Sequence, residues 1–272
     1  MRSANKCNKE AMRVLKETSR TFYIPITLLK PTLKKAVASA YLSMRAVDEI
    51  EDHEQLPHQV KAGLLEETSQ LLLKPFDVKT YQNLIAPYLE VLPEVTKRLG
   101  DWLSICPDGI VDKVKASTST MAIGMAKWVR KDWKIHTKED LDDYTYYVAG
   151  LVGVMLSDIW SWYDDTETDQ ELAIGFGRGL QSVNILRNQD EDQERGVTFM
   201  PDGWARDDMF AYATENLSLA EAYMKDIDNR NIATFCKIPY KLAEKTLTVM
   251  KHGSEKMTRA EVAAVVEDIV ND

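Results

Sequence analysis

The sequence predicts an all-α protein, and three observations support this prediction. Glycine and proline, which sandwiches and barrels need for their many turns, number only 12 and 9 among 272 residues. Apolar residues recur at intervals of three and four over long stretches, which is the spacing of one helical face. Alternation of apolar and polar residues never lasts beyond about five residues, so no strand pattern competes. Because no linker, repeat or low-complexity tract divides the chain, we expect one domain, residues 1–272.

The predicted helices follow from this periodicity and from the residues that begin or end them. A first helix covers 8–18, and 19–25, rich in β-branched and aromatic residues and ended by a proline, is predicted to be a loop. Pro31 begins the next helix, because proline suits a first helical turn. The apolar face of this helix is formed by Leu33, Val37, Ala40, Met44 and Val47. Further helices are expected at 57–73, 79–99, 110–129, 138–162, 169–194, 207–227, 229–252 and 258–270, with glycines such as Gly100 in the connections.

Composition and charge narrow the classes of function. The net charge of −9 and the lack of a dense Lys/Arg cluster make nucleic acid an unlikely partner. An anionic substrate would require divalent cations, because carboxylates and phosphates repel one another. The three cysteines are far apart and in no paired spacing, which is typical of reduced thiols in a cytoplasmic protein.

No segment of the sequence has the pattern of a signal peptide or a membrane span. Residues 1–11 carry scattered charges without an apolar core. The most apolar stretch, 146–156, is too short to cross a bilayer and is followed by Asp158. We therefore expect a soluble, cytoplasmic protein without a transmembrane segment.

Asp48 and Asp52 form a first carboxylate pair on the helix that begins at Pro31. At about 100° per residue they share an arc of about 80° with Val37, Tyr41 and Arg45. Burying two carboxylates without a cation is costly, because each loses its hydration and repels the other. One interpretation is a solvated helix end where Arg45 pairs with Asp48. The other is a Mg²⁺ site, which needs one or two carboxylates and is completed by water and phosphate oxygens.

A second polar stripe lies on the predicted helix 169–194. It consists of Gln181, Asn184, Asn188 and Asp192, again within an arc of about 80°. These groups replace apolar residues on a face that should point to the core, where unsatisfied amides would destabilise the fold. The stripe is either a hydrogen-bonded amide ladder between helices or an oxygen-rich metal face opposite the first pair.

Glycines in the predicted helices need a reason, because each costs about 1 kcal/mol relative to alanine. Gly150 and Gly153 allow either close approach of another helix or a slot for a long aliphatic chain. The segment 175–179, Gly-Phe-Gly-Arg-Gly, is superficially similar to a nucleotide-binding loop. Without a preceding strand this similarity carries almost no weight.

Taken in order, four motifs make the sequence similar to the squalene/phytoene synthase family, the head-to-head branch of the all-helical isoprenoid synthases. The motifs are Ser19-Arg-Thr-Phe22, Tyr41-x-x-x-Arg45-x-x-Asp48-x-x-x-Asp52, Tyr146-x-Val-Ala-Gly150-x-Val-Gly153 and Gln181-x-x-Asn184-Ile-Leu-Arg-Asn188-x-x-x-Asp192. The resemblance covers residues 19–201 and favours the metal interpretation of the carboxylate pair.

The resemblance implies a single helical bundle around a central apolar cavity that binds a prenyl diphosphate, with farnesyl diphosphate as the expected substrate and Mg²⁺ as the cofactor. The implied metal ligands are Asp48, Asp52, Asn184, Asn188 and Asp192. The implied substrate contacts are Ser19, Phe22, Tyr41, Arg45, Val148, Gln181 and Asn184. Tyr146 joins Asp48, Asp52, Asn188 and Asp192 as an implied catalytic residue.

The sequence departs from the family pattern at Asn188, where the resemblance leads us to expect aspartate. A neutral amide holds Mg²⁺ less tightly than a carboxylate. We therefore expect ionisation of one prenyl diphosphate and capture of the cation by water, which gives a prenyl alcohol such as farnesol. One alternative is the ordinary condensation of two farnesyl diphosphates to presqualene diphosphate, dehydrosqualene or squalene, or of longer substrates to a phytoene-type product. Another is an inactive prenyl-lipid-binding protein.

Several properties stay open at this level. They are the chain length of the substrate, the need for a nicotinamide cofactor, the oligomeric state and the contribution of the C-terminal residues to the site. A lipophilic product would allow peripheral contact with a membrane.

Overall fold

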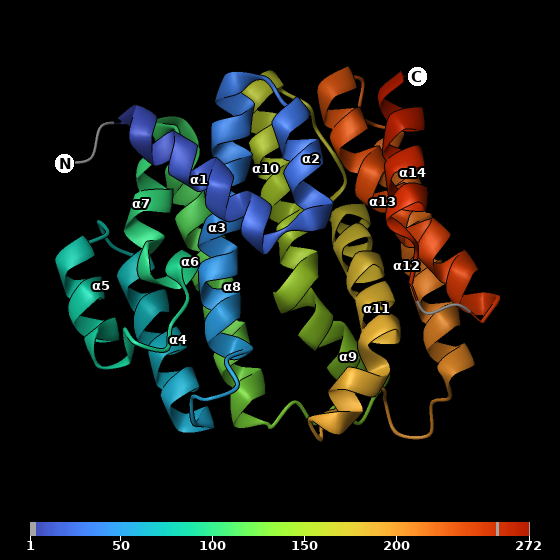
Figure 1. The fold of residues 1–272 in the computed structure, drawn as a ribbon, viewed down its shortest axis with the longest axis horizontal. Coiled ribbons are helices and arrows are strands. Elements are labelled where there is room, and N and C mark those ends of the chain that lie inside the picture. Colours follow the sequence, from blue (N-terminus) through green and yellow to red (C-terminus); the bar gives the residue numbers. More distant parts are fainter. Residues whose placement is uncertain (1–3, 254–255, 272) are drawn as a thin grey trace. The chain divides into compact units, whose positions relative to one another are not determined.

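Every regular element in residues 4–253 and 256–271, the parts of the chain that the computed structural model describes, is helical (Figure 1). The prediction of an all-α protein is confirmed. The chain divides into two compact units, residues 1–132 (unit 1) and 133–272 (unit 2). One domain over 1–272 stays a prediction.

Unit 1 is organised around one buried helix, α3. Its described elements are α1 (Ala4–Thr18), α2 (Arg20–Leu28), α3 (Pro31–Glu51), α4 (His58–Leu72), α5 (Val78–Ile85), η1 (Ala86–Tyr88), α6 (Glu94–Lys97), α7 (Leu99–Ser104) and α8 (Asp108–Arg130). Thirteen of the 21 residues of α3 are buried, and α3 packs against α1, α4, α6, α7 and α8. A helix that is apolar on nearly all sides belongs in a core. As predicted, Pro31 is its first residue.

The loop predicted at 19–25 is wrong, because this segment begins helix α2. Ser19 has extended backbone angles, and its Oγ accepts a hydrogen bond from the Phe22 amide at 2.9 Å. A serine in this position caps a helix by satisfying an amide that has no partner in the first turn. Pro25 lies inside the helix. Over only nine residues, the serine cap outweighs the β-branched and proline signals on which the prediction depended.

The single helix predicted at 79–99 is also wrong. The structure has α5, the short 3₁₀ turn η1, α6 and then α7 in this region. Pro87 and Pro93 explain the division, because proline removes an amide donor and restricts the residue before it. Gly100, expected in a connection, lies inside α7.

Most of the described helices begin within two residues of their predicted starts, α11, α13 and α14 among them. The structure places α11 at Gln170–Glu194, α13 at Arg230–Lys251 and α14 at Arg259–Asn271. Asp169 and Asn229 cap α11 and α13 by accepting hydrogen bonds from amides of the first turn. Such residues are readable in a sequence because they act locally.

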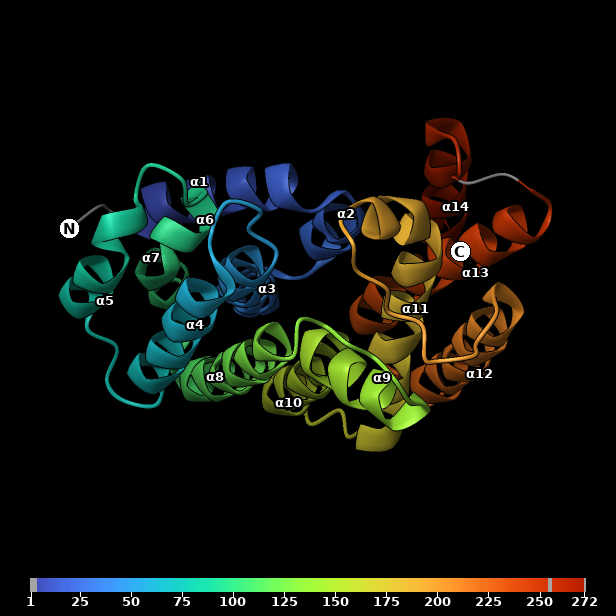
Figure 2. The ribbon, with the colours of Figure 1, turned by 90° about the horizontal axis from the view of Figure 1, so that it is seen from below.

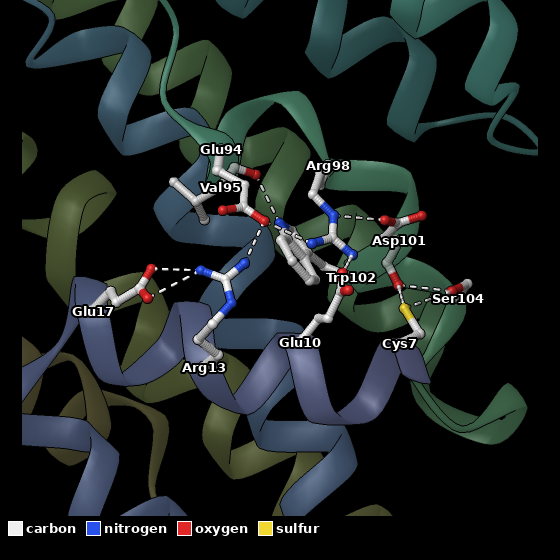
Figure 3. A network of polar contacts seen from close by, with 10 residues as sticks. All are labelled: Cys7, Glu10, Arg13, Glu17, Glu94, Val95, Arg98, Asp101, Trp102 and Ser104. Carbon is white, nitrogen blue, oxygen red and sulfur yellow. Dashed lines mark hydrogen bonds and ion pairs between the residues drawn. The ribbon is translucent and has the colours of Figure 1, made fainter. Parts of the chain in front are cut away.

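The Arg98 guanidinium links α1, α6 and α7 through ion pairs (Figure 3). It forms ion pairs with Glu10 at 2.6 Å, Glu94 at 2.7 Å and Asp101 at 2.7 Å. Its carbon centre also lies 4.7 Å from the Trp102 ring centroid, where a cation is attracted to the ring face. One side chain, 13% exposed, therefore balances three carboxylates from three helices.

We expect Arg98→Ala to lower the free energy of unfolding by about 2 kcal/mol, because Glu10 and Asp101 lose their ion pair with Arg98 while Glu94 keeps only Arg13. Urea denaturation would measure this change. Arg13→Ala is the matched control: Arg13 pairs with Glu94 at the edge of the same network but is 46% exposed. It should cost less than about 1 kcal/mol. Equal losses in the two variants would contradict the central position of Arg98.

Unit 2 contains the remaining elements. These are α9 (Lys138–Thr145), η2 (Tyr146–Gly150), α10 (Leu151–Asp164), α11, α12 (Arg206–Met224), α13 and α14. The helix predicted at 138–162 is interrupted by η2, a π-helical turn. Such turns occur frequently at functional sites, and this one carries both Tyr146 and Val148.

Glycines allow α11 to pack very closely on its neighbours in unit 2, with α11 between α10 and α12 (Figure 2). A Cβ atom added to Gly153 would lie 2.1 Å from the Ala173 carbonyl oxygen. One added to Gly177 would lie 2.1 Å from the Ala149 carbonyl oxygen. At these positions, close packing of two helices is the alternative that the structure supports.

The glycine-rich segment 175–179 is part of helix α11 and not a phosphate-binding loop. Gly175 approaches Leu219 of α12, and a Cβ atom there would lie 2.5 Å from its Cδ1. Gly179 meets α12 as well, near Leu217. The alternation of glycines therefore lets α11 pack against helices on two sides.

We expect Gly153→Ala to lower the free energy of unfolding by about 3 kcal/mol, because the new methyl group would overlap a main-chain carbonyl that cannot move aside. Gly63→Ala in α4 is the control, since a Cβ atom there meets nothing within 4 Å. This change should raise stability by up to about 1 kcal/mol. Denaturation curves of the two variants check both signs, and a neutral Gly153→Ala would show that the contact is not tight.

Candidate active site

The last turns of α3 hold the first cluster of charged groups. Arg45 pairs with Asp48, and its Nη2 donates to Glu49 Oε1 at 2.6 Å. The three side chains are 26–30% exposed. The ion pair that the sequence suggested is therefore present, but the charges lie partly buried and not on a solvated helix end.

Asp48 and Asp52 influence each other electrostatically. Burial raises the pKa of Asp48, the negative charge of Asp52 raises it further, and Arg45 opposes both effects. Asp52 lies one residue beyond the end of α3, as its C-cap, and its amide donates to the Asp48 carbonyl at 2.9 Å. Two carboxylates in this position repel each other, so a divalent cation would stabilise them.

The motif of Ser19 and Phe22 meets the motif of Tyr41 inside unit 1. The Tyr41 hydroxyl donates to the Thr18 carbonyl at 3.2 Å, next to Ser19, and burial raises the pKa of Tyr41. The Phe22 and Tyr41 ring centroids are 6.0 Å apart. The Ser19 oxygen accepts from the Phe22 amide, and a hydrogen bond from the Ser19 side chain to Tyr41 opposes the rise in the Tyr41 pKa. Tyr41 is one helical turn before Arg45, so these residues form one continuous cluster.

Glu51 and Lys61 belong to this region and were missed by the sequence reasoning. Glu51 is 2% exposed and Lys61 is 5% exposed. The Lys61 ammonium donates to the Glu51 carbonyl at 2.7 Å, which fixes the end of α3 against α4. No sequence pattern signals this contact, because Lys61 binds the main-chain carbonyl of Glu51 and not its side chain.

Unit 2 carries a polar cluster of its own, the stripe of α11. Asp192 is 6% exposed, and burial raises its pKa while an ion pair with Arg195 opposes the shift. The Asn188 side chain is half-buried, and its Oδ1 accepts from the Arg187 Nε at 3.2 Å. The stripe therefore offers one buried carboxylate and one amide oxygen where the resemblance predicted two carboxylates.

The other two members of the stripe do not form the amide ladder that was the structural alternative. Gln181 and Asn184 are half-buried. Within the described part of the chain, neither side-chain amide makes a hydrogen bond. Neither residue has a buried amide atom without a partner, so both amides remain accessible to water or to a ligand.

The π-helical turn is held by a network that the sequence reasoning also missed. The Arg178 Nε donates to Thr145 Oγ1 at 3.1 Å, and its Nη2 donates to the Asp142 carbonyl at 2.9 Å. Tyr212 donates to the Asp142 carboxylate. Arg178 lies between two glycines of α11, so the close packing that they allow brings it to the start of the turn that carries Tyr146.

The oxygen donors present suit a hard cation such as Mg²⁺. Among the described residues, no group of three or more His, Cys, Asp and Glu side chains could hold a metal by itself. Mg²⁺ does not require such a cage, because it binds through one or two carboxylates together with substrate phosphates and water. Asp48 and Asp52 therefore fit a metal that binds together with a diphosphate.

The order and spacing of these clusters are those of a known family. The family model of squalene/phytoene synthase matches residues 15–209. The chain belongs to the squalene/phytoene synthase family. The family resemblance drawn from the four motifs over 19–201 is thereby confirmed.

Full-length comparisons agree with this membership of the squalene/phytoene synthase family. The squalene synthase of Dictyostelium discoideum is 30% identical over 96% of this chain and 70% of its own length. The human squalene synthase is 26% identical over 97% of this chain and 70% of its own length. The chain is thus similar to these enzymes well beyond the region of the motifs.

Solved structures of the family show the same fold. The complex of TcSQS with the ligand BPH1237 matches with a TM-score of 0.78 and 24% identity, covering 96% of this chain and 86% of that one. A dehydrosqualene synthase in complex with a ligand matches with a TM-score of 0.69 and 18% identity, covering 98% and 96%. The isoprenoid-synthase fold is confirmed, whereas the roles of single residues and the central apolar cavity stay predictions.

The sequence also led us to expect no transmembrane segment and three reduced cysteines. Within the described residues, no helix combines the length and apolar composition that crossing a bilayer requires. Cys7, Cys106 and Cys236 are each buried and free. The cytoplasmic location itself stays a prediction.

Proposed function

We propose that the chain is a magnesium-dependent enzyme that ionises an allylic prenyl diphosphate, with farnesyl diphosphate as the expected substrate. Family membership supports the substrate class. Asp48 and Asp52 would hold the metal at one face, and Asn184, Asn188 and Asp192 would form a weaker second face. When bound, Mg²⁺ supplies positive charge that stabilises the departing diphosphate.

The residues of the chain have separate tasks in this proposal. The Ser19 hydroxyl, the Arg45 guanidinium and the Tyr146 phenol would donate hydrogen bonds to diphosphate oxygens, which places charge and donors where negative charge develops. Gln181 and Asn184 would contact the substrate through their half-buried amides. Arg45 would shift part of its pairing from Asp48 and Glu49 to the substrate.

The prenyl tail needs an apolar surface that keeps water from the allylic cation until the product forms. Phe22 and Tyr41, whose rings lie together in unit 1, would supply part of it. Val148, which is half-buried in η2 of unit 2, would supply another part. These assignments rest on the resemblance and are proposals for each residue.

The product that we propose is the prenyl alcohol. The bond between the allylic carbon and the diphosphate oxygen breaks, a water oxygen bonds to that carbon, and the water loses a proton. The products are a prenyl alcohol, inorganic diphosphate and one proton. The observation that carries this proposal is Asn188, which removes one negative charge from the second face. Coupling two substrates requires two ionisations. A weak second metal face should therefore impair the coupling reaction more than it impairs the ionisation of one substrate.

Nearby acids are poorly placed to replace the missing charge. Asp190 and Glu191 are both exposed, whereas Asp192 is buried. Glu191 also lies 3.5 Å from the Lys256 ammonium. Exposed carboxylates on another side of α11 contribute little to a metal bound at the Asn188 face.

A second candidate function is the head-to-head condensation of two prenyl diphosphates to presqualene diphosphate, dehydrosqualene, squalene or a phytoene-type product. The comparisons favour this candidate, because the relatives reported above are squalene synthases. Asparagine can still bind a metal through its amide oxygen, so the motif does not forbid coupling.

A third candidate, an inactive prenyl-lipid-binding protein, is disfavoured by the chain itself. Loss of metal ligands would be expected in a protein that no longer reacts with diphosphates. Both Asp48 and Asp52 are retained, and the charge of Asp52 raises the pKa of Asp48 although Arg45 opposes this effect. Magnesium-dependent release of diphosphate would exclude this candidate.

One experiment separates the three functions. The purified chain is incubated with farnesyl diphosphate in Mg²⁺ and, separately, in EDTA, and the products are identified by chromatography. We expect farnesol and inorganic diphosphate with Mg²⁺ and neither with EDTA. Presqualene diphosphate or a condensed hydrocarbon as the main product would establish the second candidate, and no turnover in either condition would favour the third.

A further inference from the structure

The first 35 residues of the chain have a net charge opposite in sign to that of the rest. Residues 1–35 contain nine lysines and arginines and only two glutamates, a net charge of +7, although the whole chain carries −9. The remaining residues therefore carry −16. The overall charge repels anionic surfaces, but exposed charges farther apart than about 8 Å are largely screened at physiological salt. A local cluster thus determines what this part of the molecule attracts.

Part of the cluster forms a stripe on α1. Lys6, Lys9, Arg13 and Lys16 are exposed, and their spacing of three and four places them within an arc of about 80°. Arg13 is occupied by Glu17 and Glu94. The lysines are therefore the members that present their charge to solvent along the helix.

The next helix, α2, exposes apolar side chains, and Lys16 of the stripe lies near its first turn. Ile24 is 39% exposed and Leu28 is 36% exposed, one helical turn apart. The Lys16 ammonium lies 5.8 Å from the ring centroid of Tyr23, the residue before Ile24. Exposed Lys30 follows Leu28 by two residues. In unit 1, α1 and α2 follow one another along the same side (Figures 1 and 2).

We propose that α1 and α2 form a docking surface for an anionic lipid bilayer, with Ile24 and Leu28 inserted among the acyl chains and Lys16 and Lys30 among the headgroups. Apolar residues flanked by lysines on a short helix are typical of segments that lie in a membrane interface. Lysine suits this position because its stem stays apolar while its ammonium reaches the phosphates. The occupant is a bilayer and not a nucleic acid, because the exposed apolar pair would find no partner on a phosphate backbone.

Charge and apolar contact should contribute separately to this binding. Each lysine near an anionic membrane contributes about a fivefold gain in partitioning. Insertion of Ile24 and Leu28 should contribute about a further tenfold each, given the apolar area that they expose. Neither contribution suffices alone, so binding should require an anionic bilayer and intact apolar side chains together.

The test is cosedimentation of the full chain with vesicles of phosphatidylcholine and phosphatidylglycerol in equal parts, and with pure phosphatidylcholine vesicles. We expect binding to the mixed vesicles only, and release when salt rises from about 0.1 M to about 1 M. Lys16→Gln with Lys30→Gln should weaken binding by about 25-fold. Ile24→Ser with Leu28→Ser should abolish most of it. No substrate is added, so the outcome is independent of the proposed reaction.

Matched controls keep the proposal falsifiable. Lys74→Gln with Lys79→Gln removes two exposed lysines elsewhere in unit 1, and Leu89→Ser with Val91→Ser removes two apolar side chains that are each 40% exposed. Both controls should bind as the wild type does. The proposal is overturned if the chain does not bind, if it binds both kinds of vesicle equally, or if the controls lose binding as much as the Lys16/Lys30 and Ile24/Leu28 variants do.

Discussion

Asp48→Asn is expected to reduce the release of diphosphate from farnesyl diphosphate by about three orders of magnitude while leaving the thermal stability of the metal-free chain unchanged or higher. The loss follows because one carboxylate of the first metal face becomes a neutral amide at the point where charge develops on the leaving group. Release of inorganic diphosphate under saturating Mg²⁺ measures it.

The stability of the same variant follows from the electrostatics of α3. Asp48 is only 26% exposed, and its charge lies near that of Asp52, so the two carboxylates repel in the absence of a cation. Asparagine has nearly the same shape and removes one of the repelling charges. Arg45 keeps an ion pair with Glu49, so it is not left buried and alone. We therefore expect a melting temperature no lower than that of the wild type.

Glu49→Gln provides the matched control. Glu49 also pairs with Arg45 and is also 26% exposed, but it lies outside the proposed metal ligands. This variant should keep its activity within about tenfold of the wild type. If Asp48→Asn kept its activity, or lost it only together with its fold, Asp48 would not be a metal ligand.

The elements that were predicted well are those fixed by short-range chemistry. Asp169 and Asn229 mark the starts of α11 and α13 because a cap acts within three residues. The same locality explains the error at 19–25, where Ser19 capped a helix that the β-branched composition obscured. The interruption of 138–162 by a π-helical turn depends on packing against α11, which no local pattern encodes.

The candidate site residues also differ in how far the sequence could predict them. The stripes of Asp48 with Asp52 and of Gln181 with Asp192 follow from a period of about 3.6 residues, because they lie on or at the end of single helices. The contact of Tyr41 with the Thr18 carbonyl joins elements far apart in sequence, and so does that of Arg178 with Asp142. Such contacts depend on how helices pack, so the sequence alone could place these residues in motifs but not against one another.

Asn188→Asp should increase the ratio of condensed product to prenyl alcohol by at least about tenfold. The substitution places a second carboxylate in the polar stripe of α11, one helical turn before Asp192. This carboxylate should strengthen Mg²⁺ binding at the face needed for a second ionisation. A charge difference of one unit in a metal site changes transition-state stabilisation by a few kcal/mol, which is ample for this effect. Product ratios from farnesyl diphosphate, compared with those of the wild type, measure it.

Gln189→Asp is the control that tests whether the position of the new negative charge matters. Gln189 is the next residue of α11, about 100° around the helix from Asn188, and its Oε1 accepts from Arg206 at 2.6 Å. It adds the same charge to the same helix but away from the polar stripe, so the product ratio should stay that of the wild type. If both variants increased condensation, net charge alone would control the reaction. If Asn188→Asp produced only more alcohol, the second metal face would not limit coupling, and the reason for proposing the alcohol as the product would be lost.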